Sequence, residues 1–209
     1  MSMQIAARVN ALSPTELIVQ KDLPAARLIS DVLCPPVVAT ISIAVSAAHL
    51  ATPSAWEAAA FFLVLAVGIP TLYIVWLLYR GEVTDFHLRV REQRIKPMIV
   101  IVTTTVSAWL LLFARQAPAL LVGVATVGLT ITVILLLVTL RWKISVHTTA
   151  ISGFVVLCWW LAGASVAPLA LSVPLVAWSR IQLRRHTLAQ TIAGAVLGFT
   201  ISWAFTAIR

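Results

Sequence analysis

The chain has 209 residues, of which 61% are hydrophobic and only 11% are charged, and its formal net charge at pH 7 is +8. A soluble globular domain is nearer half apolar and a quarter charged, so this composition excludes an ordinary soluble domain and places the chain in the membrane class. Its apolar runs are too long and too continuous for a membrane β-barrel. Because helices satisfy their own backbone polar groups in lipid, the sequence predicts an all-α, polytopic transmembrane helical bundle.

In chain order, residues 1–30 are of mixed polarity and are predicted to form a surface segment ahead of a single transmembrane domain at 31–209. The stretch at 148–178 is apolar but contains Gly163, Pro168 and Pro174, and it is read either as two short crossings or as a re-entrant hairpin. Both readings return the chain to the same side, and about six to seven membrane segments result. The other apolar segments, most of them near the length that a bilayer requires, lie at 32–52, 57–79, 98–114, 118–140 and 187–207.

The basic residues are confined to alternate loops. With these segments, 13 of the 15 Lys and Arg residues fall on one side of the membrane, and only Arg115 and Arg209 fall on the other. By the positive-inside rule the basic side is cytoplasmic, so we expect an integral protein of a prokaryotic plasma membrane with its basic loops inside the cell. The positive charge is explained by this topology and by membrane lipids, and it does not indicate a nucleic-acid partner.

Two of three loops on that side, 80–97 and 141–147, carry cations beside residues suited to an anion site. If the first loop is helical, Asp85, Arg89 and Lys96 share one face; the alternative is a solvated connector. In the second, Ser145 and His147 stand where a helix begins, and free N–H groups there attract anions. The alternative is that Ser145 is a simple cap.

The third loop, 179–187, combines a cation, an imidazole and an amide. His186 and Gln190 are four residues apart, so the amide can reach the ring. Arg180 would share their side only if the chain bends between it and His186. The alternative is a set of arginines reaching lipid headgroups. Together, the three loops predict a phosphate pocket with two histidines.

These residues resemble the type 2 phosphatidic acid phosphatases, relatives of the vanadium haloperoxidases. The resemblance covers about half of the chain, from 80 to 198, and keeps the spacing inside each of the family's three motifs, K-x6-R-P, P-S-G-H and S-R-x5-H-x3-D. The matching residues are Arg89-x6-Lys96-Pro97, Ile144-Ser145-Val146-His147 and Ser179-Arg180-x5-His186-x3-Gln190.

The resemblance implies a metal-independent lipid phosphate phosphatase without a cofactor. His186 would attack phosphorus to form a phosphohistidine, and His147 would protonate the leaving alkoxide and then activate water. The substrate would be a phosphomonoester or diphosphate of a phospholipid or polyprenyl lipid that enters from the bilayer. The phosphoryl oxygens would be held by Arg89, Lys96, Arg180, the Ser145 hydroxyl and the Val146 N–H.

Gln190 is the most serious departure from the family, which has aspartate at this position. An amide can fix the imidazole tautomer but supplies no charge, and whether Asp85 replaces the missing carboxylate stays open. Two other readings therefore remain. One is a catalytically weak or silent homologue that binds or carries a lipid phosphate. The other is an isoprenoid-diphosphate enzyme that releases pyrophosphate.

Several further residues are given structural roles. His87 lies in the first loop and could join the pocket, but it is interpreted as a solvated histidine, and with Asp85 it offers too few ligands to argue a metal site. Gly194 and Gly198 form a G-x-x-x-G pattern that predicts close helix packing inside the bundle and leaves a homodimer open.

Overall fold

The computed structural model describes residues 23–207, and these residues form helices without any strand. Five of the helices are long and apolar enough to cross a membrane, and a bent pair near the N-terminus makes a sixth. The prediction of an all-α chain with several membrane-spanning helices is confirmed. Most of the predicted surface segment, residues 1–22, lies outside the described residues.

The bent pair consists of α3 (Pro24–Val32) and α4 (Pro35–Leu50), which meet at 46°. Proline disfavours the helical conformation of the residue before it, and Cys34 is accordingly extended, so the chain turns there before Pro35 starts α4. The predicted domain boundary after residue 30 therefore falls inside a helix. Because α3 packs against α10 (Ser172–Gln182), Ser30 and Asp31 belong to the helical bundle.

The next crossing is continuous from Pro53 to Tyr79, but it contains a π-helical turn. It is built from α5 (Pro53–Phe62), the π segment η1 (Leu63–Gly68) and α6 (Ile69–Tyr79). Pro70 lacks an N–H and its ring would collide with a carbonyl one turn earlier, and a wider turn relieves that conflict. Residues of η1 and Pro70 line a cavity described below.

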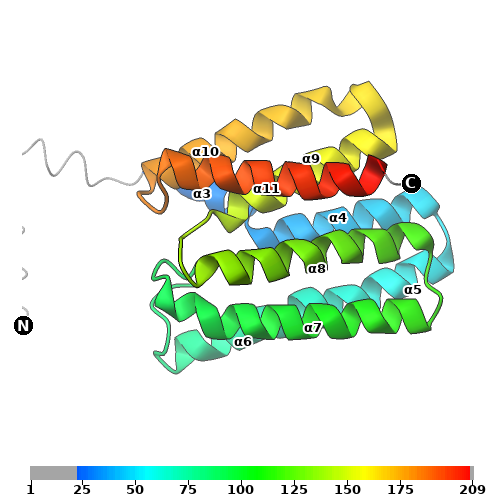
Figure 1. The fold of residues 1–209 in the computed structure, drawn as a ribbon, viewed down its shortest axis with the longest axis horizontal. Helices are drawn as coiled ribbons and strands as arrows, with labels where there is room; N and C mark the ends of the chain where they lie inside the picture. The colour runs from blue at the N-terminus through cyan, green and yellow to red at the C-terminus, as the bar shows by residue number, and fades with distance from the viewer. Residues whose placement is uncertain (1–22, 208–209) are drawn as a thin grey trace, which may run out of the picture.

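After a loop, the short 3₁₀ segment η2 (Glu92–Arg94) leads into α7 (Ile95–Ala114), and α8 (Ala119–Thr139) returns. The apolar stretch at 148–178 is then divided into α9 (Val146–Ala162), the 3₁₀ segment η3 (Gly163–Leu171) and α10. Figure 1 shows α9 and α10 running in opposite directions along the bundle with η3 at the reversal. Gly163, with a φ of 62°, ends α9 in a conformation that favours glycine.

The loops after α6, α8 and α10 all lie at one end of the bundle, which is also the end where α3 lies (Figure 1). The sequence predicted this common side from the number of crossings between the loops. At the opposite end, α4, α5, α7 and α8 enclose a core of Ile43, Ala59, Phe62, Leu112 and Leu121. The basic loops and this apolar core therefore lie at opposite ends of the bundle.

The last helix, α11 (Leu188–Ala207), packs closely against α9. A Cβ atom placed on Gly198 would collide with the backbone of Thr149, and one placed on Gly194 would collide with Thr148 and the Ser145 carbonyl. The prediction that these glycines serve packing inside the bundle is confirmed. Their close approach also fixes the starts of α9 and α11 beside each other, where the Ser145 N–H donates to the Gln190 carbonyl over 3.2 Å.

Candidate functional site

The loop after α10 is folded back onto the end of that helix. Arg184 has a left-handed φ of 50°, and the N–H of Arg185 donates to the Arg180 carbonyl over 3.0 Å, as in a Schellman cap. The His186 N–H reaches the same carbonyl over 3.3 Å. This cap is the bend that the sequence required between Arg180 and His186, and it brings the imidazole back over α10.

The tautomer of His186 follows from the hydrogen bonds of Gln190. Gln190 Oε1 accepts the Thr187 N–H over 3.2 Å, so the atom facing His186 Nδ1 at 3.1 Å is the amide oxygen. His186 Nδ1 must then carry the proton, which leaves a lone pair on Nε2. Burial lowers the pKa of His186 to about 3, and the nearby charges of Arg180, Arg94 and Lys143 act in the same direction. The ring is therefore neutral and nucleophilic at neutral pH.

His147 lies in the first turn of α9 and is only 4% exposed. The residue before the helix, Ser145, is completely buried, and its hydroxyl accepts the Thr148 N–H as an N-cap. This is the simpler of the two roles weighed for Ser145, and its side chain does not line the cavity. Val146 and His147 do line it.

Arg180 is a buried cation without a carboxylate partner among residues 23–207. It is 1% exposed, and its Nη1 donates to the Ser30 hydroxyl over 2.6 Å and lies 3.4 Å from His147 Nε2. Within the described part of the chain, its Nε has no hydrogen-bond partner. A buried guanidinium with an unused donor is costly unless an anion completes its environment.

Arg94, rather than Lys96, is the cation that the first loop contributes. Arg94 is 4% exposed, and its Nε donates to the Leu88 carbonyl over 2.7 Å. The Lys96 side chain is 72% exposed and pairs with Glu82 at 3.1 Å. Side chains two residues apart on a helix point in nearly opposite directions, so only one of the two can face the bundle.

Arg89 and Asp85 also lie away from the cavity lining. The expected helix over the first loop is absent, since helical structure begins only at η2. The Asp85 carboxylate accepts the backbone N–H groups of His87 and Arg89, each over 3.0 Å, and therefore organises the loop. Arg89, with its side chain 53% exposed, stays beside Asp85. The structure does not place Asp85 against His186, whose Nδ1 is held by Gln190.

His87 differs from its interpretation as a solvated histidine. Its side chain is 14% exposed, its Nε2 lies 2.9 Å from Asp31 Oδ1, and its ring centroid is 5.3 Å from that of His147. Burial lowers the pKa of His87, with Arg185 and Arg180 acting in the same direction, while the hydrogen bond and charge of Asp31 oppose them. A third imidazole therefore belongs to the site.

These groups meet at a cavity of about 240 Å³, which we call the basic cavity. Its polar lining includes His87, Arg94, His147, Arg180 and His186, and no Asp or Glu of the described chain lines it. Nearby, burial and the charges of Arg94 and Arg180 lower the pKa of Lys143. The cavity therefore combines neutral imidazoles with uncompensated positive charge, which is the environment of an anion site.

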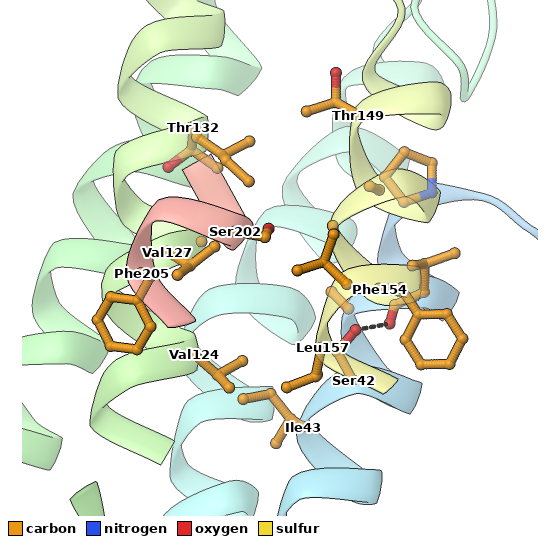
Figure 2. A pocket seen from close by; sticks show the side chains of 18 of the residues that line it. Ser42, Ile43, Val124, Val127, Thr132, Thr149, Phe154, Leu157, Ser202 and Phe205 are labelled. Carbon is orange, nitrogen blue, oxygen red and sulfur yellow. Dashed lines mark hydrogen bonds between the residues drawn. The ribbon is translucent and has the colours of Figure 1, made fainter. Parts of the chain in front are cut away.

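A second, almost wholly apolar cavity of about 220 Å³ adjoins the first, and we call it the inner cavity. Figure 2 shows side chains from α4, α8, α9 and α11 around it, among them Ile43, Val127, Leu157 and Phe205. The two cavities share wall residues, including Pro35, Ala39, Gly128, Thr132, Leu135 and Val146. The charged site thus adjoins apolar space inside the bundle.

In residues 23–207, no group of three or more His, Cys, Asp or Glu side chains is arranged to hold a metal ion. The chain matches no family model, no curated protein and no solved structure.

Sequence reasoning missed Ser30, Asp31 and Arg94 and undervalued His87. Arg94 carried a usable signal, because it stands two residues before Lys96 at the start of an apolar span, and only one of the two can face inward. Ser30 and Asp31 carried none, since their role depends on the packing of α3 against α10. Residues distant in sequence cannot be paired from spacing alone.

Proposed function

We propose that the protein is a membrane-embedded phosphohydrolase that removes phosphate from a lipid phosphate through a phosphohistidine on His186. The observation that carries the proposal is the basic cavity, where two buried guanidinium groups face neutral imidazoles and where residues 23–207 contribute no carboxylate to the lining. A phosphate dianion would supply the missing negative charge and accept the unused Nε–H of Arg180. The resemblance of the three loops to the type 2 phosphatidic acid phosphatases supports the same reading.

In the proposed reaction, the lone pair of His186 Nε2 attacks phosphorus as the bond from phosphorus to the lipid oxygen breaks. Arg94 and Arg180 hold the equatorial oxygens while charge redistributes. The leaving alkoxide takes a proton from a second imidazole, a role that the family resemblance gives to His147. The same imidazole then takes a proton from water, which attacks the phosphohistidine, breaks the N–P bond and releases phosphate.

The inner cavity supports a substrate with an apolar chain. Its volume of about 220 Å³ exceeds that of an engineered apolar cavity, about 150 Å³, that stays dry and binds benzene. The shared wall places this space directly beside the phosphate position. A chain lying there would gain about 0.8 kcal/mol for each buried methylene group, so both acyl and polyprenyl phosphates fit the proposal.

The basic end is proposed to face the cytoplasm. Among the described residues, Arg115 is the single Lys or Arg at the opposite end, where it lies 3.4 Å from Glu57. The arginines of the site would lie at the basic end in either orientation, but half-exposed Arg91 and exposed Arg141 and Arg184 do not line the basic cavity. Their position favours the positive-inside orientation of a plasma membrane protein.

The test is release of inorganic phosphate from a panel of lipid phosphates and diphosphates by the purified protein and by His186→Ala. The control is His49→Ala, which changes a histidine in the last turn of α4. We expect release by the wild type and by His49→Ala, and loss of it in His186→Ala. Phosphorus NMR of an alkali-quenched reaction should show a phosphoramidate, which is stable in alkali and is hydrolysed in acid. Pyrophosphate as the product would instead identify an isoprenoid-diphosphate enzyme.

Gln190 gives weight to a second candidate, a lipid-phosphate carrier without turnover. The amide orients His186 but cannot stabilise a positive imidazole as a carboxylate would. Equal silence of the wild type and His186→Ala on every lipid, with retained binding of the same lipids, would replace the phosphatase proposal by the carrier.

A further inference from the structure

Among residues 23–207 the site contains one carboxylate–imidazole pair, and it is not on the expected nucleophile. Asp31 Oδ1 lies 2.9 Å from Nε2 of His87, which lines the basic cavity. Because a carboxylate can only accept a hydrogen bond, His87 Nε2 carries the proton. The other ring nitrogen, Nδ1, has no hydrogen-bond partner within residues 23–207. An imidazole backed by a carboxylate is the arrangement that best tolerates a positive charge during proton transfer.

His147 is less suited to the same task. Its Nε2 lies 3.4 Å from Arg180 Nη1, and a guanidinium can only donate, so this nitrogen must keep its lone pair for the arginine. A proton on that nitrogen would face the N–H of a fixed cation. In this geometry His147 is an acceptor that helps Ser30 to hold Arg180 in place.

We propose that His87, positioned by Asp31, is the general acid and base of the reaction, with His147 as a positioning residue for Arg180. This assignment rests on the proposed phosphohydrolase function. Protonated His87 gives its proton to the lipid oxygen as the bond to phosphorus breaks. Neutral His87 then accepts a proton from the water that attacks phosphorus and displaces Nε2 of His186, and phosphate leaves.

The surroundings of His87 define its pH behaviour. Asp31 on α3 favours the charged ring, whereas Arg180 on α10 and Arg185 in the following loop oppose it. The ring of His147 on α9 lies beside it, and Asp85 accepts its backbone N–H. A bound phosphate dianion would offset the two arginines, so the charged form of His87 is favoured when substrate is present.

The experiment compares hexadecyl phosphate, which leaves as an alkoxide, with p-nitrophenyl phosphate, whose phenolate leaves without a proton. In His87→Asn we expect kcat/KM, which reports only the steps up to the phosphohistidine, to fall about 100-fold on hexadecyl phosphate, within the range for a lost general acid, and to change much less on p-nitrophenyl phosphate. His49→Asn, on the far end of α4, is the matched control. His147→Asn should lower both rates together.

Asp31→Asn provides a second measurement that does not need the imidazole to be removed. Asp31 raises the pKa of His87, so its loss should move the alkaline limb of the kcat profile for hexadecyl phosphate to lower pH, by about one unit. Asp31→Glu should restore the limb. A purely structural role for Asp31 would lower the rate at every pH without moving the limb.

The outcomes separate this assignment from the proposed function. An active wild type in which His147→Asn shows the leaving-group-dependent loss and His87→Asn resembles His49→Asn overturns the role of His87 alone. An equal loss of kcat/KM on both substrates in His87→Asn, with an unmoved limb in Asp31→Asn, does the same. A wild type that is silent on both substrates overturns the phosphohydrolase proposal and the role of His87 with it.

Discussion

The basic cavity and the inner cavity share part of one wall. In the described part of the chain, two guanidinium groups and three imidazoles line the first, whereas the second presents an almost entirely apolar surface. In the first, burial makes the empty site costly, because the charges of Arg94 and Arg180 have no carboxylate partner among the described residues. In the second, burial is favourable for any apolar occupant. A single amphipathic ligand with an anionic head and an apolar chain would satisfy both.

The largest effect is expected from Arg180→Met, which keeps an unbranched apolar stem but removes the charged guanidinium group. Phosphate release should fall about 1,000-fold, because the main donor to the phosphoryl oxygens is lost. The thermal midpoint of the empty protein should stay the same or rise, since a buried unpaired charge has been removed. Arg184→Met, an exposed neighbour in sequence, is the matched control and should change neither quantity.

The next largest effect is expected to distinguish two neighbouring cations near the start of α7. Arg94→Met should lower phosphate release about 100-fold, whereas Lys96→Met should lower it less than about 3-fold, because only Arg94 faces the basic cavity. Steady-state rates on one lipid phosphate measure both. A larger loss in Lys96→Met would show that Lys96, which matches the motif of the type 2 phosphatidic acid phosphatases, binds the phosphate, and that Arg94 does not.

The choice between Arg94 and Lys96 shows the limit of what could be predicted from the sequence. The common side of the three loops followed from hydropathy and parity, and the His186–Gln190 contact followed from helical spacing, because both depend on local order. The choice between Arg94 and Lys96 depended on where η2 ends and α7 begins, which shifts a side chain to the opposite face. The Asp31–His87 pair joins positions 56 residues apart and exists only through tertiary packing.

A smaller effect tests the apolar half of the comparison. Gly128 lines both cavities, and a Cβ atom placed on it meets no other atom within 4 Å, so Gly128→Leu should fill the space without a clash at Cβ. Hydrolysis of hexadecyl phosphate should fall about 10-fold, the cost of displacing about two buried methylene groups. Hydrolysis of butyl phosphate should hardly change.

Thr130→Leu is the matched control for that variant, because it adds an apolar side chain at an exposed position on the same helix. Both variants should retain the thermal midpoint of the wild type. If Gly128→Leu hydrolyses the long and the short alkyl phosphate in the wild-type ratio, the chain of the substrate lies outside the bundle and the inner cavity has another purpose.

The smallest predicted effect is a loss of stability of the protein without ligand at low pH. Burial lowers the pKa of His186 to about 3, below its ordinary value of 6.5. Between pH 6.5 and pH 3, His186 is therefore protonated in the unfolded chain but not in the folded chain. Stability should therefore fall as the pH is lowered through that window. In His186→Gln, which cannot titrate, the fall in thermal midpoint between pH 7 and pH 4 should be smaller by roughly 5 °C. Tryptophan fluorescence during heating measures it, with His49→Gln as control.

Added orthophosphate should shrink the difference between the wild type and His186→Gln, because an anion beside Arg180 and Arg94 offsets the charges that hold the pKa of His186 down.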